Sequence, residues 1–162
     1  MTLLFSTGAY AKGDYRVTHI VDGDTLEATD GNITFRVRIA GMDAPEWKQR
    51  FGRQATNRLR QLTLNKKITI HPLEKMRDKY GRLLGHVFVG KKDVSLVMIG
   101  EGLAFYSRPF CRDYPKDRER YDYSPLPYVQ AELRAKIKGR GVWIQDPLIL
   151  PCAYRKQHPY RP

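Results

Sequence analysis

The chain has 162 residues, 41% hydrophobic and 11% aromatic, which excludes an intrinsically disordered protein and is typical of a single globular domain. Its 29 lysines and arginines against 17 acidic residues give a net charge of +12, which favours a polyanionic partner such as nucleic acid or an anionic surface. No apolar run approaches 18 residues, so the sequence predicts no membrane-spanning helix.

The N-terminal residues and the two cysteines give information about the cellular compartment of the protein. Residues 1–11 carry no charged side chain and end in Ala9-Tyr10-Ala11, like the tail of a secretory signal; a frayed terminus is the alternative. Cys111 and Cys152 fit no metal-ligand spacing and are compatible with one disulfide in an oxidising compartment or with two free thiols. We therefore expect an exported protein, periplasmic or secreted, with a cytoplasmic one as the alternative.

Alternating and helical patterns define the expected elements. Strands are predicted at Tyr15–Val21, Thr25–Ala28, Ile33–Ile39, Lys67–His71 (ended or edged by Pro72) and Leu83–Val89. Helices are predicted at Gly52–Thr63, from an Asp93 N-cap to Ile99, and at Tyr128–Lys138, where Val129, Leu133 and Ile137 recur four apart. Residues 77–82 read as a polar loop, and residues 106–127 are loop-like.

This order of elements matches a mainly β protein with helices (α+β), namely a five-stranded OB-fold barrel with about three α-helices. The predicted organisation is a possible signal remnant at 1–11, the barrel domain at 12–146 and a basic, Pro-rich, irregular tail at 147–162. Such a fold alone implies binding rather than chemistry.

Carboxylates cluster in two turns, Asp22-Gly23-Asp24 and Asp43-Ala44-Pro45-Glu46. Asp24 and Asp43 lie at the ends of strands that can be neighbours, so their carboxylates can converge on one cation. Oxygen donors without Cys or His select Ca²⁺ or Mg²⁺. The plainer alternative for Asp22-Gly23-Asp24 is an ordinary Asp-Gly turn.

Three further residues complete a possible site. Arg38 offers a fork for phosphate, Glu46 can take a proton from a water, and Arg82 is a second cation for transition-state charge. Each residue also has a plainer interpretation. Arg38 could form a salt bridge to an aspartate, Glu46 could be solvated or could place its charge at the start of the next helix, and Arg82 could be solvated. Together with the aspartates, this inventory is that of metal-assisted phosphodiester hydrolysis.

The motifs I-V-D-G-D-T (20–25), V-R-I-A-G-M-D-A-P-E (37–46), D-K-Y-G-R (78–82) and E-G-L-A (101–104) resemble the staphylococcal nuclease (thermonuclease) family from about Tyr15 to Trp143. The resemblance implies an OB-fold with a Ca²⁺-dependent endonuclease site that acts on DNA and RNA, prefers single-stranded or unpaired substrate and leaves 3′-phosphates. We expect a monomer. The alternatives are a non-catalytic OB-fold module that binds nucleic acid or protein and, less well supported, a basic adhesion or envelope protein.

Position by position, the resemblance assigns Ca²⁺, favoured over Mg²⁺, to Asp24, Asp43 and the Ala44 carbonyl, with alanine standing where the type enzyme has threonine. Glu46 corresponds to the general base, and Arg38 and Arg82 to the catalytic arginines. The expected substrate contacts are Lys79, Tyr80, Arg36 and Asp22, with Tyr106 and Phe110 as candidates for base stacking. The 106–127 segment is longer than in the type enzyme, so no motif places the stacking tyrosines there.

Overall fold

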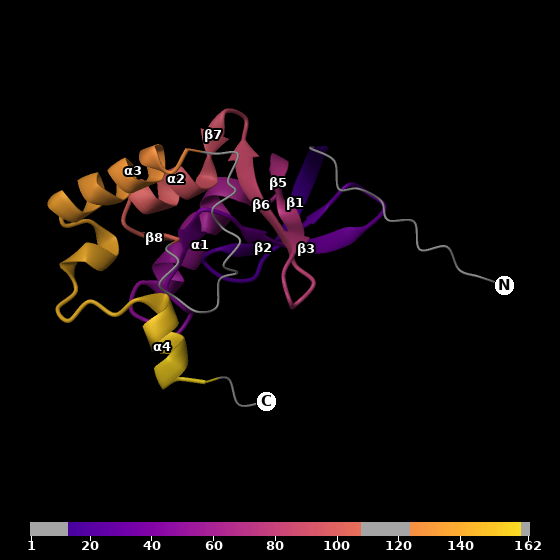
Figure 1. The fold of residues 1–162 in the computed structure, drawn as a ribbon. Helices are drawn as coiled ribbons and strands as arrows, with labels where there is room; N and C mark the ends of the chain where they lie inside the picture. The colour runs from indigo at the N-terminus through magenta and orange to yellow at the C-terminus, as the bar shows by residue number, and fades with distance from the viewer. Residues whose placement is uncertain (1–12, 108–123, 160–162) are drawn as a thin grey trace.

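The computed structural model describes residues 13–107 and 124–159 (Figure 1). Its strands are β1 (Gly13–Ile20), β2 (Thr25–Thr29), β3 (Thr34–Ile39), β4 (Met42–Asp43), β5 (Lys67–Arg77), β6 (Leu83–Val89), β7 (Lys92–Asp93) and β8 (Phe105–Tyr106). Its helices are α1 (Gly52–Thr63), α2 (Val94–Gly100), α3 (Leu126–Ile137), α4 (Pro151–Gln157) and the 3₁₀ turn η1 (Gly141–Ile144).

Five strands form a closed barrel in the order β3-β2-β1-β5-β6, and a parallel pairing of β3 with β6 closes it. The other neighbours in this barrel are antiparallel. The register sets Thr25 opposite Arg38 and Val37 opposite Leu83. The predicted α+β barrel of five strands is therefore confirmed.

The barrel interior is filled by the apolar residues that alternate along the strands. Val17, Leu26, Val37, Ile70 and Leu83 are all fully buried. Helix α1 contributes Ala55 and Leu59 to the same core. The inward face of β3 begins at Phe35 and not at Ile33, because Ile33 belongs to the preceding turn, where its backbone N–H donates to Asp30 Oδ1 (3.0 Å).

Strand β5 and the C-terminal tail differ from the sequence prediction. β5 continues past Pro72 to Arg77, and its pairing with β6 shifts register between these residues, since proline offers no N–H to the ladder. The tail predicted to be irregular contains α4, with Pro151 in its first turn, where a missing N–H is tolerated. The described residues thus contain four α-helices where about three were expected.

Figure 1 shows α2 and α3 side by side; α2 packs against β6 of the barrel, and α3 packs on α2 and β8. Helix α2 begins at the predicted cap, because Asp93 Oδ1 accepts from the backbone N–H groups of Ser95 and Leu96. Helix α3 buries Tyr128 and Glu132, among others, and leaves the predicted apolar stripe of Val129, Leu133 and Ile137 exposed.

Polar anchors explain this orientation of α3. Tyr128 Oη donates to Asp93 Oδ2 (2.6 Å), and Glu132 Oε1 accepts from the Tyr106 backbone N–H (3.0 Å). Both anchors lie on the face that meets α2 and β8. None of the helices in the described segments is long and apolar enough to cross a bilayer.

Candidate active site

Two tight turns bring the acidic residues together at one end of the barrel. Asp22 Oδ1 accepts from the Asp24 backbone N–H (3.0 Å), so the carboxylate predicted to contact substrate builds the turn between β1 and β2. A Cβ on Gly23 would lie 2.7 Å from the Ala44 Cβ. Glycine at this position therefore lets the two acidic turns touch.

Arg38 lies between the two aspartates. Its Nη1 is 3.1 Å from Asp24 Oδ2, and its Nη2 is 3.1 Å from Asp43 Oδ1. Nη1 also donates to the Met42 carbonyl, and all three charged side chains are buried. Asp24 Oδ2 accepts from the Ala44 backbone N–H as well (2.8 Å), which ties the second turn to the first.

Burial dominates the electrostatics of these aspartates. Desolvation raises the pKa of Asp24 to about 6; Arg38 opposes the rise and Asp22 adds to it. Desolvation likewise raises the pKa of Asp43, again opposed by Arg38. Asp24, Asp43 and Glu46 lie beside two guanidinium groups, those of Arg38 and Arg155, so negative charge is in excess and the site favours a further cation.

The donor set suits a hard divalent ion. Two carboxylates that already share one cationic group, followed in sequence by the Ala44 carbonyl, provide the oxygen ligands that Ca²⁺ prefers. Within residues 13–107 and 124–159, no group of three or more His, Cys, Asp and Glu side chains is arranged to hold a metal. The predicted set contains only two such side chains, and its third ligand is backbone.

Glu46 follows the second turn and is half-buried. Its carbonyl packs against the start of α1, where a Cβ on Gly52 would lie 1.9 Å from the Glu46 oxygen. Its side chain meets a residue that the sequence did not suggest, Arg155 of α4. Arg155 Nη1 lies 2.6 Å from Glu46 Oε1 and 3.4 Å from Asp43 Oδ1.

Burial and Arg155 act in opposite directions on Glu46. Desolvation raises the pKa of Glu46, and the hydrogen bond from Arg155 opposes the rise. Burial disfavours the charged form of Arg155, but Asp43 and Glu46 outweigh it and raise the pKa of Arg155. Glu46 and Arg155 therefore form an ion pair within the candidate site.

Arg82 reaches the site from the turn before β6. Its Nε donates to Asp78 Oδ2 (2.7 Å), and its Nη1 lies 3.4 Å from Thr25 Oγ1. Thr25 Oγ1 in turn donates to Asp24 Oδ1 (3.2 Å). A hydrogen-bonded chain thus links Arg82 to the carboxylate pair.

Lys79 and Tyr80 form an exposed rim on the same turn. Lys79 Nζ and Arg82 Cζ lie 5.0 Å and 5.3 Å from the centroid of the Tyr80 ring, which is 71% exposed as a residue. Two cations that lie over an exposed tyrosine ring provide positive charge for a phosphate beside an aromatic group, a combination that suits a nucleotide.

The other predicted substrate contacts lie elsewhere. Arg36 is exposed and pairs with Glu27 on the neighbouring strand (3.0 Å). Tyr106 stacks on Tyr128 with ring centroids 5.9 Å apart. Phe110 lies outside the described residues. These roles in substrate binding remain predictions.

Sequence reasoning missed three contributors to the site: Thr25, which links Arg82 to Asp24, and the two charged residues Asp78 and Arg155. Asp78 stands four residues before Arg82 in a turn, a spacing that could have suggested the pair. Arg155 has no local signal, because 109 residues separate it from Glu46 and the tail carries no motif.

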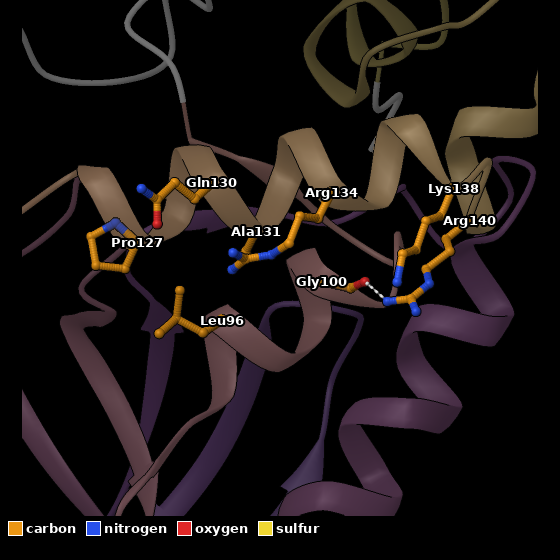
Figure 2. A pocket seen from close by; sticks show the side chains of 8 residues that line it. All are labelled: Leu96, Gly100, Pro127, Gln130, Ala131, Arg134, Lys138 and Arg140. Atoms are coloured by element: carbon orange, nitrogen blue, oxygen red, sulfur yellow. Dashed lines mark hydrogen bonds between the residues drawn. The ribbon is translucent and has the colours of Figure 1, made fainter.

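A separate cavity of about 390 Å³ lies between α2 and α3 (Figure 2). Arg134, Lys138 and Arg140 line it with apolar and neutral groups, and no acidic residue is among its lining residues. Arg140 Nη1 donates to the Gly100 carbonyl at the end of α2 (2.9 Å), as Figure 2 shows. The cavity is therefore electropositive and suits an anionic ligand.

Comparison with known proteins agrees with this geometry. Residues 36–145 match the family described as staphylococcal nuclease homologue. An uncharacterised endonuclease of Haemophilus influenzae is 34% identical over 147 residues, which cover 90% of this chain and 75% of the relative. A micrococcal nuclease of Shigella flexneri is 33% identical, covering 96% and 88%. A thermonuclease of Staphylococcus intermedius is 29% identical, covering 80% and 75%.

Proposed function

Because the chain belongs to the staphylococcal nuclease homologue family, we propose that it is a calcium-dependent endonuclease that hydrolyses phosphodiester bonds of DNA and RNA and leaves 3′-phosphates. One observation carries the proposal: Arg38 is held between two buried carboxylates, with Glu46 beside them. A structural or purely binding domain has no need of buried charges in this arrangement, since burying them costs free energy.

Asp24, Asp43 and the Ala44 carbonyl would hold Ca²⁺. When bound, the ion supplies positive charge that polarises a phosphate oxygen. Arg38 forms ion pairs with both aspartates in the structure. Once their charge is compensated, its planar fork is available for two oxygens of a phosphate.

The remaining residues perform the proton transfer and stabilise charge. Glu46 accepts a proton from the attacking water, whose oxygen bonds to phosphorus as the bond to the 5′ oxygen breaks; the 5′ oxygen leaves with the bonding electron pair and takes a proton from solvent water. The products are a 3′-phosphate and a strand with a 5′-hydroxyl. Arg38 and Arg82 stabilise the extra negative charge at phosphorus, and Asp78 and Thr25 hold Arg82 in place for this.

Nucleic acid as substrate is supported by the charge of +12 and by the exposed rim of Lys79 and Tyr80. Stacking of a base on the exposed Tyr80 ring, in place of a cation that lies over it, requires an unpaired base, so single-stranded substrate should be preferred. Affinity should fall steeply as salt increases, because phosphate contacts dominate.

Cleavage of single-stranded DNA and RNA with added Ca²⁺ or with EDTA tests the proposal. We expect cleavage only with Ca²⁺, and end-group analysis should find 3′-phosphates and 5′-hydroxyls. Binding without cleavage under both conditions would instead favour a non-catalytic binding module. Products with 5′-phosphates would contradict the proposed bond cleavage.

We also propose that the protein is exported. Cys152 is disulfide-bonded, which is typical of oxidising compartments; Cys111, the chain's other cysteine, lies outside the described residues. N-terminal sequencing of the mature protein should find Lys12 first, after the Ala9-Tyr10-Ala11 pattern. A retained Met1 would refute this cleavage site.

A further inference from the structure

The segment before α4 is attached to the turn that carries Glu46. Gln49 is buried, and its side chain bridges the two: Nε2 donates to the Ile149 carbonyl (2.7 Å), while Oε1 accepts from the Glu46 backbone N–H (3.1 Å). A buried amide with both ends hydrogen-bonded fixes the relative position of the segments it joins. The chain entering α4 is therefore held close to the candidate general base.

Helix α4 itself is anchored through its first turn. Pro151 and Cys152 are its buried residues. Arg155 follows Cys152 by three residues, so both lie on the same side of the helix. The anchored side of α4 is thus the side that directs Arg155 toward the barrel.

The charge distribution explains what Arg155 adds. Arg38 contacts Asp24 and Asp43, whereas the ion pair of Glu46 is with Arg155. Without Arg155, the Glu46 carboxylate would lie near those of Asp24 and Asp43, and no other ion pair of Glu46 is present among the described residues. A free glutamate side chain populates several rotamers, and misplacing a general base is costly for the reaction.

We propose that Arg155 is a positioning residue of the active site, which holds the Glu46 carboxylate in one conformation through Oε1 and leaves Oε2 for the water. This inference rests on the proposed function. Arg155 acts through Glu46 and by contact with Asp43, so α4 is a part of the active site that lies beyond the barrel. Its loss should lower turnover much more than substrate affinity.

Arg155→Ala, Arg155→Lys and Lys156→Ala test the role of Arg155 by steady-state cleavage of single-stranded DNA at saturating Ca²⁺. Lys156→Ala is the matched control, since it removes the same charge from the next, exposed residue of α4. We expect kcat of Arg155→Ala to fall by about 10- to 100-fold with KM within about threefold, because an orienting group is lost. Arg155→Lys should recover part of kcat, and Lys156→Ala should match the wild type.

Three outcomes would overturn the inference while leaving the nuclease assignment intact. Arg155→Ala as active as the wild type, or more so, would show a dispensable or inhibitory contact. A higher KM at unchanged kcat would assign Arg155 to substrate binding. An equal loss in Lys156→Ala would indicate a general charge effect. A wild-type protein that cleaves nothing would instead refute the proposed function.

A readout without catalysis tests the contact itself. In EDTA, Glu46→Gln and Arg155→Ala should each lower the urea midpoint. The double variant should be no less stable than Arg155→Ala, because that single change already removes the ion pair with Glu46. Additive effects would show that the two side chains do not act on one another.

Discussion

Asp78 is expected to control catalysis through Arg82. Its Oδ1 accepts from the backbone N–H groups of Tyr80 (2.9 Å) and Arg82 (3.0 Å), and its Oδ2 accepts from Arg82 Nε (2.7 Å). Replacing Asp78 by alanine therefore removes three hydrogen bonds that shape the turn and aim the Arg82 guanidinium.

The size of the effect follows from what Arg82 retains. Complete loss of one preorganised group at the transition state costs about 10²- to 10³-fold in kcat. In Asp78→Ala, Arg82 keeps its charge and its 3.4 Å contact with Thr25, so the loss should be smaller. We expect kcat to fall by about 10- to 100-fold, roughly 1.4 to 2.8 kcal/mol in activation free energy. The free energy of unfolding should fall by about 1–3 kcal/mol.

Asp30→Ala is a matched control. Asp30 builds the turn between β2 and β3 in a similar way, since its Oδ1 accepts from the backbone N–H groups of Asn32 (2.8 Å) and Ile33 (3.0 Å). It contacts no site residue, so kcat should not change. Asp78→Asn retains an oxygen that can accept from the backbone N–H groups but loses the negative charge. Its kcat should therefore lie between those of the wild type and Asp78→Ala. Wild-type kcat in Asp78→Ala, or an equal loss in Asp30→Ala, would refute the reasoning.

Three further outcomes are expected. Gly23→Ala should lower the free energy of unfolding by about 1–3 kcal/mol, because its Cβ would lie 2.7 Å from the nearest side-chain carbon. Gly100→Ala should not lower it, because the space around Gly100 is open. Equal urea midpoints for the two variants would contradict this. Burial lowers the pKa of His86, so below about pH 6.5 the unfolded state binds a proton more readily than the folded state, and the free energy of unfolding should fall. If the urea midpoint of His86→Gln changes with pH as much as that of the wild type, His86 is excluded as the cause. Arg134→Glu combined with Lys138→Glu should weaken single-stranded DNA binding and flatten its salt dependence in fluorescence anisotropy; unchanged binding would exclude the α2–α3 cavity as a nucleic-acid contact.

Local signals predicted most of the fold. The apolar spacing of Ala55, Leu59 and Leu62 predicted α1, and Asp93 was recognised as the cap of α2. The period of two along β3 predicted its inward face from Phe35 onward. These features depend on neighbours a few residues away, which the sequence displays directly.

Features that depend on residues far apart in the chain could not be predicted from local sequence patterns. The parallel closure of β3 on β6 has no local signature. Helix α3 carries two apolar faces, and the hydrogen bonds of Tyr128 and Glu132 decide which one is buried. The burial of Arg38 follows from the two aspartates around it, and the approach of Arg155 follows from the anchoring of α4.

Glu46→Gln tests the central claim most directly, because the substitution keeps the size of the side chain and removes its basicity. Initial rates on single-stranded DNA should be compared at saturating Ca²⁺, with Glu27→Gln as the control, since Glu27 pairs with the exposed Arg36. We predict that kcat falls by about 10²- to 10⁴-fold in Glu46→Gln and stays unchanged in Glu27→Gln. A Glu46→Gln protein that cleaves at the wild-type rate would contradict the assignment of Glu46 as the base.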